Sequence, residues 1–382
     1  MNFTYQNPTK LLFGEGRISE ITKHIPAGSR VLLAYGGGSI KKNGVYDQVI
    51  AALDGFFTIE FSGIEPNPRF ETLEKGVALI KENQLDFILA VGGGSVVDGC
   101  KFIAAAAYYD GDHWDIPRGK HRISQATPLA AILTLPATGS ESNGNAVVTR
   151  KATGEKLAFG SPHVYPVFSV LDPSTMKTLP ERQLKNGLVD AFIHVCEQYL
   201  TFPTGALVQD GFAEALLRTL IKLGKEFDQH DQDQWRANLM YAANQGLNGL
   251  ISCGVPNDWA THQIGHELTA RFGIDHAQTL SIIQPSLLRN QIELKRAKLE
   301  QMGSAVFGLP ATDDLAEKTV DAIEGFYQSL SMPVRLSDAN ITDQGDIDAL
   351  LNIIAGRNFL KAIGENGKIT PEVIREIVIA AR

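Results

Sequence analysis

The chain has 382 residues, of which 44% are hydrophobic and 20% charged, an ordinary composition for a globular protein of two or three domains. The net charge is −8 and no block of Lys or Arg occurs, so we expect neither nucleic acid nor a membrane as a partner. We expect a cytoplasmic location, because the N-terminus lacks an apolar signal segment and the three cysteines lie far apart.

Strand and helix signals alternate over the first 180 residues. Short apolar runs predict strands at 31–35, 56–61, 86–91 and 129–134, and helical spacing predicts helices at 44–53, 69–83 and 95–109. A short hairpin is expected within 147–159, with its turn at Thr153-Gly154. Strands that alternate with helices indicate βαβ units and a parallel sheet.

The pattern changes after Pro180, where strand signals nearly vanish and prolines are widely spaced. Helices are predicted at 181–200, 206–226, 233–250, 259–271, 286–305, 313–330 and 346–356. We therefore expect two domains, an α/β domain with a parallel sheet over residues 1–180 and an all-helical domain over residues 181–382.

Two of the predicted strands end in the same tetrapeptide, Gly-Gly-Gly-Ser, at 36–39 and 92–95. Glycines after a strand let backbone N–H groups approach an anion, and the N-terminus of the next helix adds a favourable partial charge. Ser95 and Asp98 also have the spacing of a helix-capping box, with Asp98 supporting the loop. Because ligands bind at the carboxyl ends of parallel strands, the two loops predict a site for a phosphate-bearing ligand.

The loop that closes the next predicted strand, 134–143, is rich in glycine and hydroxyl groups. It suits a ribose or pyrophosphate, and it fits a well-capped turn equally well. NAD sites usually carry an acid against the ribose 2′-hydroxyl, but the first strand ends without one and is followed by Lys41-Lys42. This favours NADP(H), although the two lysines also fit ordinary solvated side chains.

A cluster of metal-binding residue types lies in the helical part. Asp190 and His194 are one helical turn apart, as are His262 and His266, and His276 follows. One carboxylate with several imidazoles suits Zn²⁺ or Fe²⁺ and suits Ca²⁺ or Mg²⁺ poorly. Each pair alone also fits a surface salt bridge, and spacing does not decide between His262 and His266 as a ligand.

Together these residues resemble the metal-dependent, iron-containing alcohol dehydrogenase family. The similarity rests on GGGSVVDGCK at 92–101, LPATGSESN at 135–143, and the Asp190 to His276 cluster. The branch of bacterial NADPH-dependent butanol dehydrogenases and broad-specificity aldehyde reductases is the most similar, because it shares YGGGS and the Glu-Pro-Asn-Pro turn at 65–68.

The resemblance implies a dehydroquinate synthase-like fold, in which a dinucleotide-binding α/β domain precedes a helical metal domain and the active site lies between them. It implies a homodimer, and Zn²⁺ or Fe²⁺ held by Asp190, His194, His262 and His276, with His266 beside the metal. The cofactor positions that it implies are Gly37, Gly38, Ser39, Asn67, Gly93, Gly94, Ser95, Thr134, Thr138, Ser140, Asn143 and Lys156.

The family chemistry is hydride transfer between the nicotinamide of NADP(H) and an aldehyde or primary alcohol whose oxygen the metal binds as a Lewis acid. His266 is the expected catalytic residue, as a proton relay, and it also fits a pocket-lining role.

Three alternatives stay open. A metal-dependent carbon–oxygen lyase on the same scaffold would need basic residues for a phosphorylated sugar acid, but only Arg271 flanks the histidines. A metallohydrolase would not use nicotinamide. A binding protein with a structural metal would favour clustered cysteines.

Overall fold

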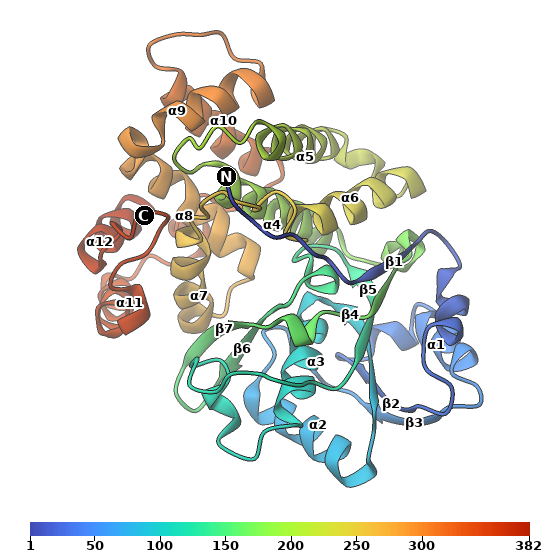
Figure 1. The fold of residues 1–382 in the computed structure, drawn as a ribbon. Coiled ribbons are helices and arrows are strands. Elements are labelled where there is room, and N and C mark those ends of the chain that lie inside the picture. The colour runs from blue at the N-terminus through green and yellow to red at the C-terminus, as the bar shows by residue number, and fades with distance from the viewer. The chain divides into compact units, whose positions relative to one another are not determined.

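The computed structural model describes all 382 residues and divides into two compact units (Figure 1). One, here called the sheet unit, comprises Gln6–Pro180 and Gln229–Asn248. The other, called the helical unit, comprises Met1–Tyr5, Glu181–Asp228 and Gly249–Arg382. The expected fold class, a parallel-sheet α/β part followed by helices, is confirmed.

The sheet unit is built on six parallel strands in the order β1-β8-β5-β4-β2-β3, and an antiparallel hairpin of β6 and β7. The strands are β1 (Lys10–Phe13), β2 (Arg30–Tyr35), β3 (Phe57–Phe61), β4 (Phe87–Gly93), β5 (Leu129–Leu135), β6 (Asn145–Arg150), β7 (Glu155–Gly160) and β8 (Phe168–Leu171).

Apolar residues on the two faces of this sheet form two separate cores. Leu32 and Ile88 face one core, in which α2 (Phe70–Asn83) and α3 (Gly94–Ala106) pack. Leu33 and Leu89, the next residues along the same strands, face the other core, to which α1 (Val45–Ala52) contributes. This arrangement follows from the alternation of side chains along a strand, and it explains why β2 and β4 are continuous apolar runs.

The carboxyl ends of three neighbouring strands, β5, β4 and β2, carry the loops that the sequence marks as anion-binding. Parallel strands end at the same edge of a sheet, so the two Gly-Gly-Gly-Ser loops and the 134–143 loop gather there. The sheet therefore brings together loops that are far apart in the chain.

The helices after Pro180 form the helical unit, except that α6 belongs to the sheet unit. They are α4 (Glu181–Tyr199), α5 (Leu207–Lys225), α6 (Asp233–Gly246), α7 (Ala260–Phe272), α8 (His276–Asn290), α9 (Ile292–Met302), α10 (Leu315–Ser329), α11 (Gln344–Gly356) and α12 (Pro371–Ala380). No helix combines the length and the apolar character needed to cross a bilayer.

The predicted helix at 286–305 is wrong, because α8 runs through Pro285 and a second helix, α9, follows Gln291. A proline inside a helix removes one backbone hydrogen bond, so the sequence pattern favoured a helix that begins after it. The proline is buried in α8 together with apolar neighbours such as Ile282 and Leu288, and this burial offsets the lost bond.

The short strands β1 and β8, which pair with each other, were not predicted. Each has four residues, too few for a periodic signal. The predicted hairpin is confirmed, with β6 and β7 antiparallel on either side of residues 151–154.

Candidate metal and dinucleotide sites

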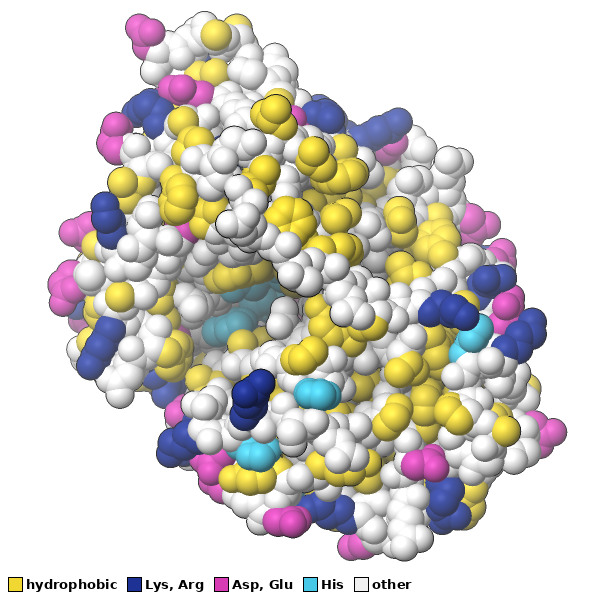
Figure 2. All heavy atoms as spheres, in the orientation of Figure 1, with side chains coloured by type: hydrophobic (Ala, Val, Ile, Leu, Met, Phe, Trp, Pro, Cys, Tyr) yellow, Lys and Arg dark blue, Asp and Glu magenta, His cyan; other side chains and the backbone are white.

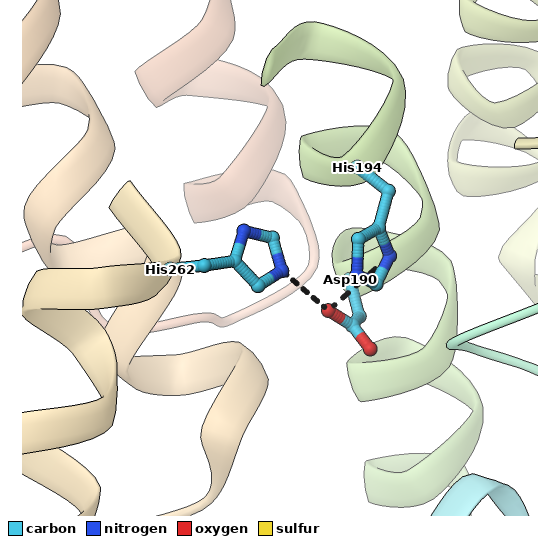
Figure 3. Close-up of side chains that lie close together, drawn as sticks. All are labelled: Asp190, His194 and His262. Atoms are coloured by element: carbon cyan, nitrogen blue, oxygen red, sulfur yellow. Dashed lines mark ion pairs between the residues drawn. The ribbon is translucent and has the colours of Figure 1, made fainter. Parts of the chain in front are cut away.

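Helix α4 presents Asp190 and His194 from one face, one turn apart, and α7 presents His262 towards them (Figure 3). All three side chains are buried, with residue exposures of 4%, 5% and 7%. Their potential ligand atoms lie within 4.8 Å of one another. The helical spacing read from the sequence therefore produces a converging group rather than a surface salt bridge.

Three imidazoles surround one carboxylate oxygen, Oδ1 of Asp190. Nδ1 of His194 and Nε2 of His262 each lie 3.6 Å from this oxygen, and Nε2 of His276 lies 4.0 Å from it. A tetrahedral zinc site with bonds of about 2.1 Å places its ligand atoms roughly 3.4 Å apart. The three nitrogens therefore lie slightly farther from Oδ1 of Asp190 than the ligand atoms of a metal-bound site lie from one another. The half-buried His276 is the farthest of the three.

The chemistry of these atoms fits a cation. Oδ1 of Asp190 and Nε2 of His262 are buried, and neither has a hydrogen-bond partner. Unpaired buried polar atoms are costly, and a metal ion would satisfy both. Burial would raise the pKa of Asp190, but the positive charges of His194, His276 and His262 outweigh it and lower that pKa well below its usual range.

The other ring nitrogen of His262 is held by Glu197, a residue that we did not predict. Nδ1 of His262 forms a short hydrogen bond to the Glu197 carboxylate, whose other oxygen accepts a 2.6 Å bond from the Thr261 backbone N–H. A carboxylate only accepts, so Nδ1 carries a hydrogen, and Nε2 is the ring nitrogen that faces Asp190 and would bind a metal after giving up its own proton. Positions 190, 194 and 197 share one helical face, which is the signal that could have identified Glu197.

The buried ammonium of Lys295 on α9 connects two of the three ligand-bearing helices, α4 and α7. It donates 2.7 Å to the carbonyl of Leu200, just after α4, and lies 2.8 Å from the carboxylate of Asp258, just before α7. Glu365 also binds it, at 2.9 Å. The backbone N–H of Asp258 donates 2.9 Å to the carbonyl of Glu197, so the end of α4 and the start of α7 are fixed to each other.

Two further residues lie beside the predicted ligands. The ring of His266 is half-buried, 5.1 Å from the ring of His276 and 6.4 Å from that of His262. Trp259 has a left-handed backbone (φ 60°), and its ring packs edge-on against His194 and His262 at 6.2 and 5.6 Å. His266 thus neighbours the cluster without belonging to the tight group of three.

In the sheet unit, three of the predicted cofactor residues contact one another. Nζ of Lys156 donates 2.8 Å to the side-chain oxygen of Asn67, and the backbone N–H of Asn67 donates to the Ser95 hydroxyl at 3.3 Å. Gly94 lies so close to Thr138 that a Cβ on Gly94 would be 2.2 Å from the threonine hydroxyl. A side chain at Gly94 would therefore force apart the loops after β4 and β5.

Ser140 and Asn143 are buried, and both accept hydrogen bonds from Lys101, a residue that we did not predict. The buried ammonium of Lys101 donates to Oγ of Ser140 at 2.8 Å and to Oδ1 of Asn143 at 3.0 Å. The Ser140 hydroxyl in turn donates to Asp98, which also accepts the backbone N–H of Val147. The expected capping box is wrong, because α3 begins at Gly94 without a side-chain cap, and Asp98 supports the 134–143 loop and β6 instead of the Gly-Gly-Gly-Ser loop before α3.

The remaining predicted cofactor residues lie at the ends of β2, β4 and β5. Gly37 and Ser39 are exposed, and Gly38 has a left-handed backbone (φ 90°) that glycine adopts without strain. Gly93 is the residue before α3, and Thr134 is buried near the end of β5. The backbone N–H groups at the start of α3 have no side-chain cap and suit an anion.

We predict that Lys295→Met weakens metal binding about 10- to 100-fold, the usual effect of losing a residue that orients metal ligands. The substitution removes the ammonium that bridges the carbonyl of Leu200 and the carboxylate of Asp258, and it leaves every predicted metal ligand in place. Competition for Zn²⁺ with a coloured chelator measures the affinity.

Lys298→Met is the matched control for this test. Lys298 lies on the same helix, is similarly buried, and pairs with Asp210 on α5; its Nζ also lies 4.4 Å from the centre of the Tyr199 ring at the end of α4, but it forms no ion pair with Asp258. It should lose comparable stability and retain its metal affinity. Equal affinities of the two variants for Zn²⁺ would contradict the positioning role of Lys295.

Comparisons with known proteins agree with this geometry. Residues 8–173 match the model of the iron-containing alcohol dehydrogenase family, and residues 185–366 match that of its C-terminal region. The chain is 50% identical to the NADPH-dependent aldehyde reductase YqhD of Escherichia coli over the full length of both, and 44% identical to a probable NADH-dependent butanol dehydrogenase of Bacillus subtilis over 90% of this chain and 91% of that one.

Structural similarity is equally extensive. The crystal structure of Escherichia coli YqhD superposes with a TM-score of 0.97, covering 100% of this chain and 99% of that one at 50% identity. A butanol dehydrogenase from Thermotoga maritima superposes with a TM-score of 0.95 at 38% identity, covering 100% and 98%. With both of its parts matched, the chain belongs to the iron-containing alcohol dehydrogenase family.

Proposed function

We propose that this protein is a metal-dependent, NADP(H)-linked alcohol dehydrogenase that reduces aldehydes to primary alcohols. The observation that carries the proposal is the buried Asp190 carboxylate with three imidazole nitrogens 3.6 to 4.0 Å from one of its oxygens. Family membership supports an oxidoreductase, and disfavours a lyase on the same scaffold or a hydrolase.

A single divalent ion, Zn²⁺ or Fe²⁺, would be held by Asp190, His194, His262 and His276. Its contribution is Lewis-acid polarisation of the substrate carbonyl. The protein residues keep the ligands ready for this role: Glu197 holds the tautomer of His262, and the Lys295 bridge holds α4 against α7.

Reduction of an aldehyde consumes one hydride and one proton. The nicotinamide supplies the hydride, and we assign the proton to His266, whose half-buried ring lies next to His276. An imidazole changes its protonation state near neutral pH, which suits it to pass a proton between the product oxygen and water.

We assign dinucleotide binding to residues 1–180 and metal binding to residues 181–382. The uncapped start of α3, with Gly93 and Gly94, suits the phosphates, and the linked side chains of Asn67, Ser95 and Lys156 offer further polar contacts. Ser140 and Asn143 are buried and are held in place by hydrogen bonds from the ammonium of Lys101. A relative named for NADPH is 50% identical, whereas four butanol dehydrogenases named for NADH are 36–44% identical, which supports NADP(H).

We also propose a homodimer that covers an apolar patch made of Met1, Phe3, Leu207, Val208 and Phe212. On α5, Leu207 is 81% exposed and Val208 67%. The N-terminal residues and α5 both contact the segment Cys253-Gly254. Gly254 packs against Phe3, and the carbonyl of Cys253 accepts a hydrogen bond from the side chain of Gln209 on α5. Figure 2 shows hydrophobic side chains gathered over α5 and the N-terminus, and exposed apolar patches of this kind commonly mark protein interfaces.

Light scattering should give the mass of two chains for the unaltered protein and of one chain for the variant with both Leu207→Glu and Val208→Glu. A one-chain mass for the unaltered protein at every concentration would refute the dimer.

A cytoplasmic location is consistent with three unpaired cysteines, of which Cys100 and Cys196 are buried. Recovery of the protein in the medium or with an extracytoplasmic marker on cell fractionation would contradict this location.

The enzymatic proposal predicts that purified, metal-loaded protein oxidises NADPH with butanal in equal amounts. Removal of the metal by a chelator should slow the reaction about a hundredfold or more, because polarisation of the carbonyl contributes several kcal/mol, and Zn²⁺ or Fe²⁺ should restore it. Absorbance of NADPH, with an assay lacking aldehyde as the control, follows the reaction. An undiminished rate in the metal-free protein would contradict the proposal, as would ester hydrolysis without NADPH oxidation.

A further inference from the structure

A carboxylate from a neighbouring strand lies beside the first Gly-Gly-Gly-Ser loop. Glu60 on β3 is paired in register with Leu33 on β2, the strand that runs into this loop. It follows the glycines by about twenty residues, the interval at which many α/β dinucleotide domains carry an acid for the ribose 2′-hydroxyl. The end of β2 carries no acid of its own. The pairing of β3 with β2 places Glu60 beside the loop, where such an acid would lie.

Two tyrosines hold both oxygens of the Glu60 carboxylate. The hydroxyl of Tyr35, at the end of β2, donates to Oε2 at 2.6 Å, and that of Tyr46, on α1, donates to Oε1 at 2.6 Å. These bonds lower the pKa of Glu60, so its carboxylate is charged at neutral pH. Glu60 is therefore a fixed negative charge rather than a mobile surface side chain.

The ammonium of Lys41 balances this charge. Lys41 lies in the short helical turn Ser39–Lys41 that follows the glycines, and its Nζ is 3.3 Å from Oε2 of Glu60 and 4.4 Å from the centre of the Tyr46 ring. The side chains of Lys41 and Glu60 are 46% and 38% exposed, so both charges face solvent beside the loop. The next residue, Lys42, is exposed and forms no ion pair.

We infer that the Lys41–Glu60 pair determines the choice between NADP(H) and NAD(H). Lys41 attracts a 2′-phosphate, while Glu60 repels it and can accept a hydrogen bond from the 2′-hydroxyl of NAD(H). This inference rests on the proposed function, because it requires a dinucleotide at the glycine loops. The charges of Lys41 and Glu60 are equal and opposite, so the loss of either one should change the preference between the two dinucleotides.

The two single substitutions must therefore act in opposite directions. Lys41→Met leaves the carboxylate in place, held by Tyr35 and Tyr46, and should lower the ratio of kcat/KM for NADPH to that for NADH about tenfold. Glu60→Gln leaves the ammonium, keeps an oxygen to accept from a tyrosine, and should raise the ratio by a similar factor. A structural role would change both dinucleotides alike.

The experiment measures these ratios with butanal, together with dissociation constants for NADP⁺ and NAD⁺, in metal-loaded protein. Lys42→Met is the matched control, because it removes an adjacent, unpaired ammonium, and its ratio should stay within about threefold of the unaltered protein. Salt at about 1 M, where the screening length is about 3 Å, should reduce both shifts.

Shifts of the two variants in the same direction, or no shift in either, would overturn the inference while leaving the enzyme assignment intact. Failure of the unaltered protein to bind either dinucleotide would refute the proposed function itself.

Discussion

The arrangement of the helical unit depends on a carboxylate buried among imidazoles. Asp190 is 4% exposed, and an isolated charge at such a position would cost several kcal/mol unless positive groups compensate it. His194 shares its helix, while His262 and His276 come from α7 and α8, so three helices must converge for this compensation. Oδ1 of Asp190 accepts no hydrogen bond from the protein, so a bound cation would complete the compensation of its negative charge.

The surrounding polar contacts serve this convergence. Glu197 fixes one imidazole, its own backbone carbonyl fixes Asp258, and Lys295 binds Asp258 and the end of α4. The sheet unit uses the same device, since the buried ammonium of Lys101 holds the loop after β5 from beneath. In both units a buried lysine with several acceptors orients residues to which we assign metal or dinucleotide binding, and replacement of such a lysine leaves unpaired acceptors behind.

Much of this organisation is readable in the sequence, because it is local. Glycine loops after apolar runs predict the carboxyl edge of the sheet, and one-turn spacing predicts the Asp190–His194 face. Spacing alone does not choose between His262 and His266, since both lie on one face of α7, and the choice came from family resemblance. The structure brings Nε2 of His262 to 3.6 Å from Asp190.

The features that escaped prediction are long-range or irregular. Glu197 meets His262 across 65 residues, and Lys295 meets Asp258 through tertiary packing, neither of which leaves a local pattern. The strands β1 and β8 are too short for a periodic signal. Pro285 lies inside α8, and the sequence pattern therefore favoured a helix that begins after it. Elemental analysis of the purified protein beside His262→Ala would show whether the Asp190 cluster holds a metal ion. We expect about one divalent ion per chain in the unaltered protein and almost none in the variant; a variant that retains a full complement of metal would contradict the assignment of His262 as a ligand.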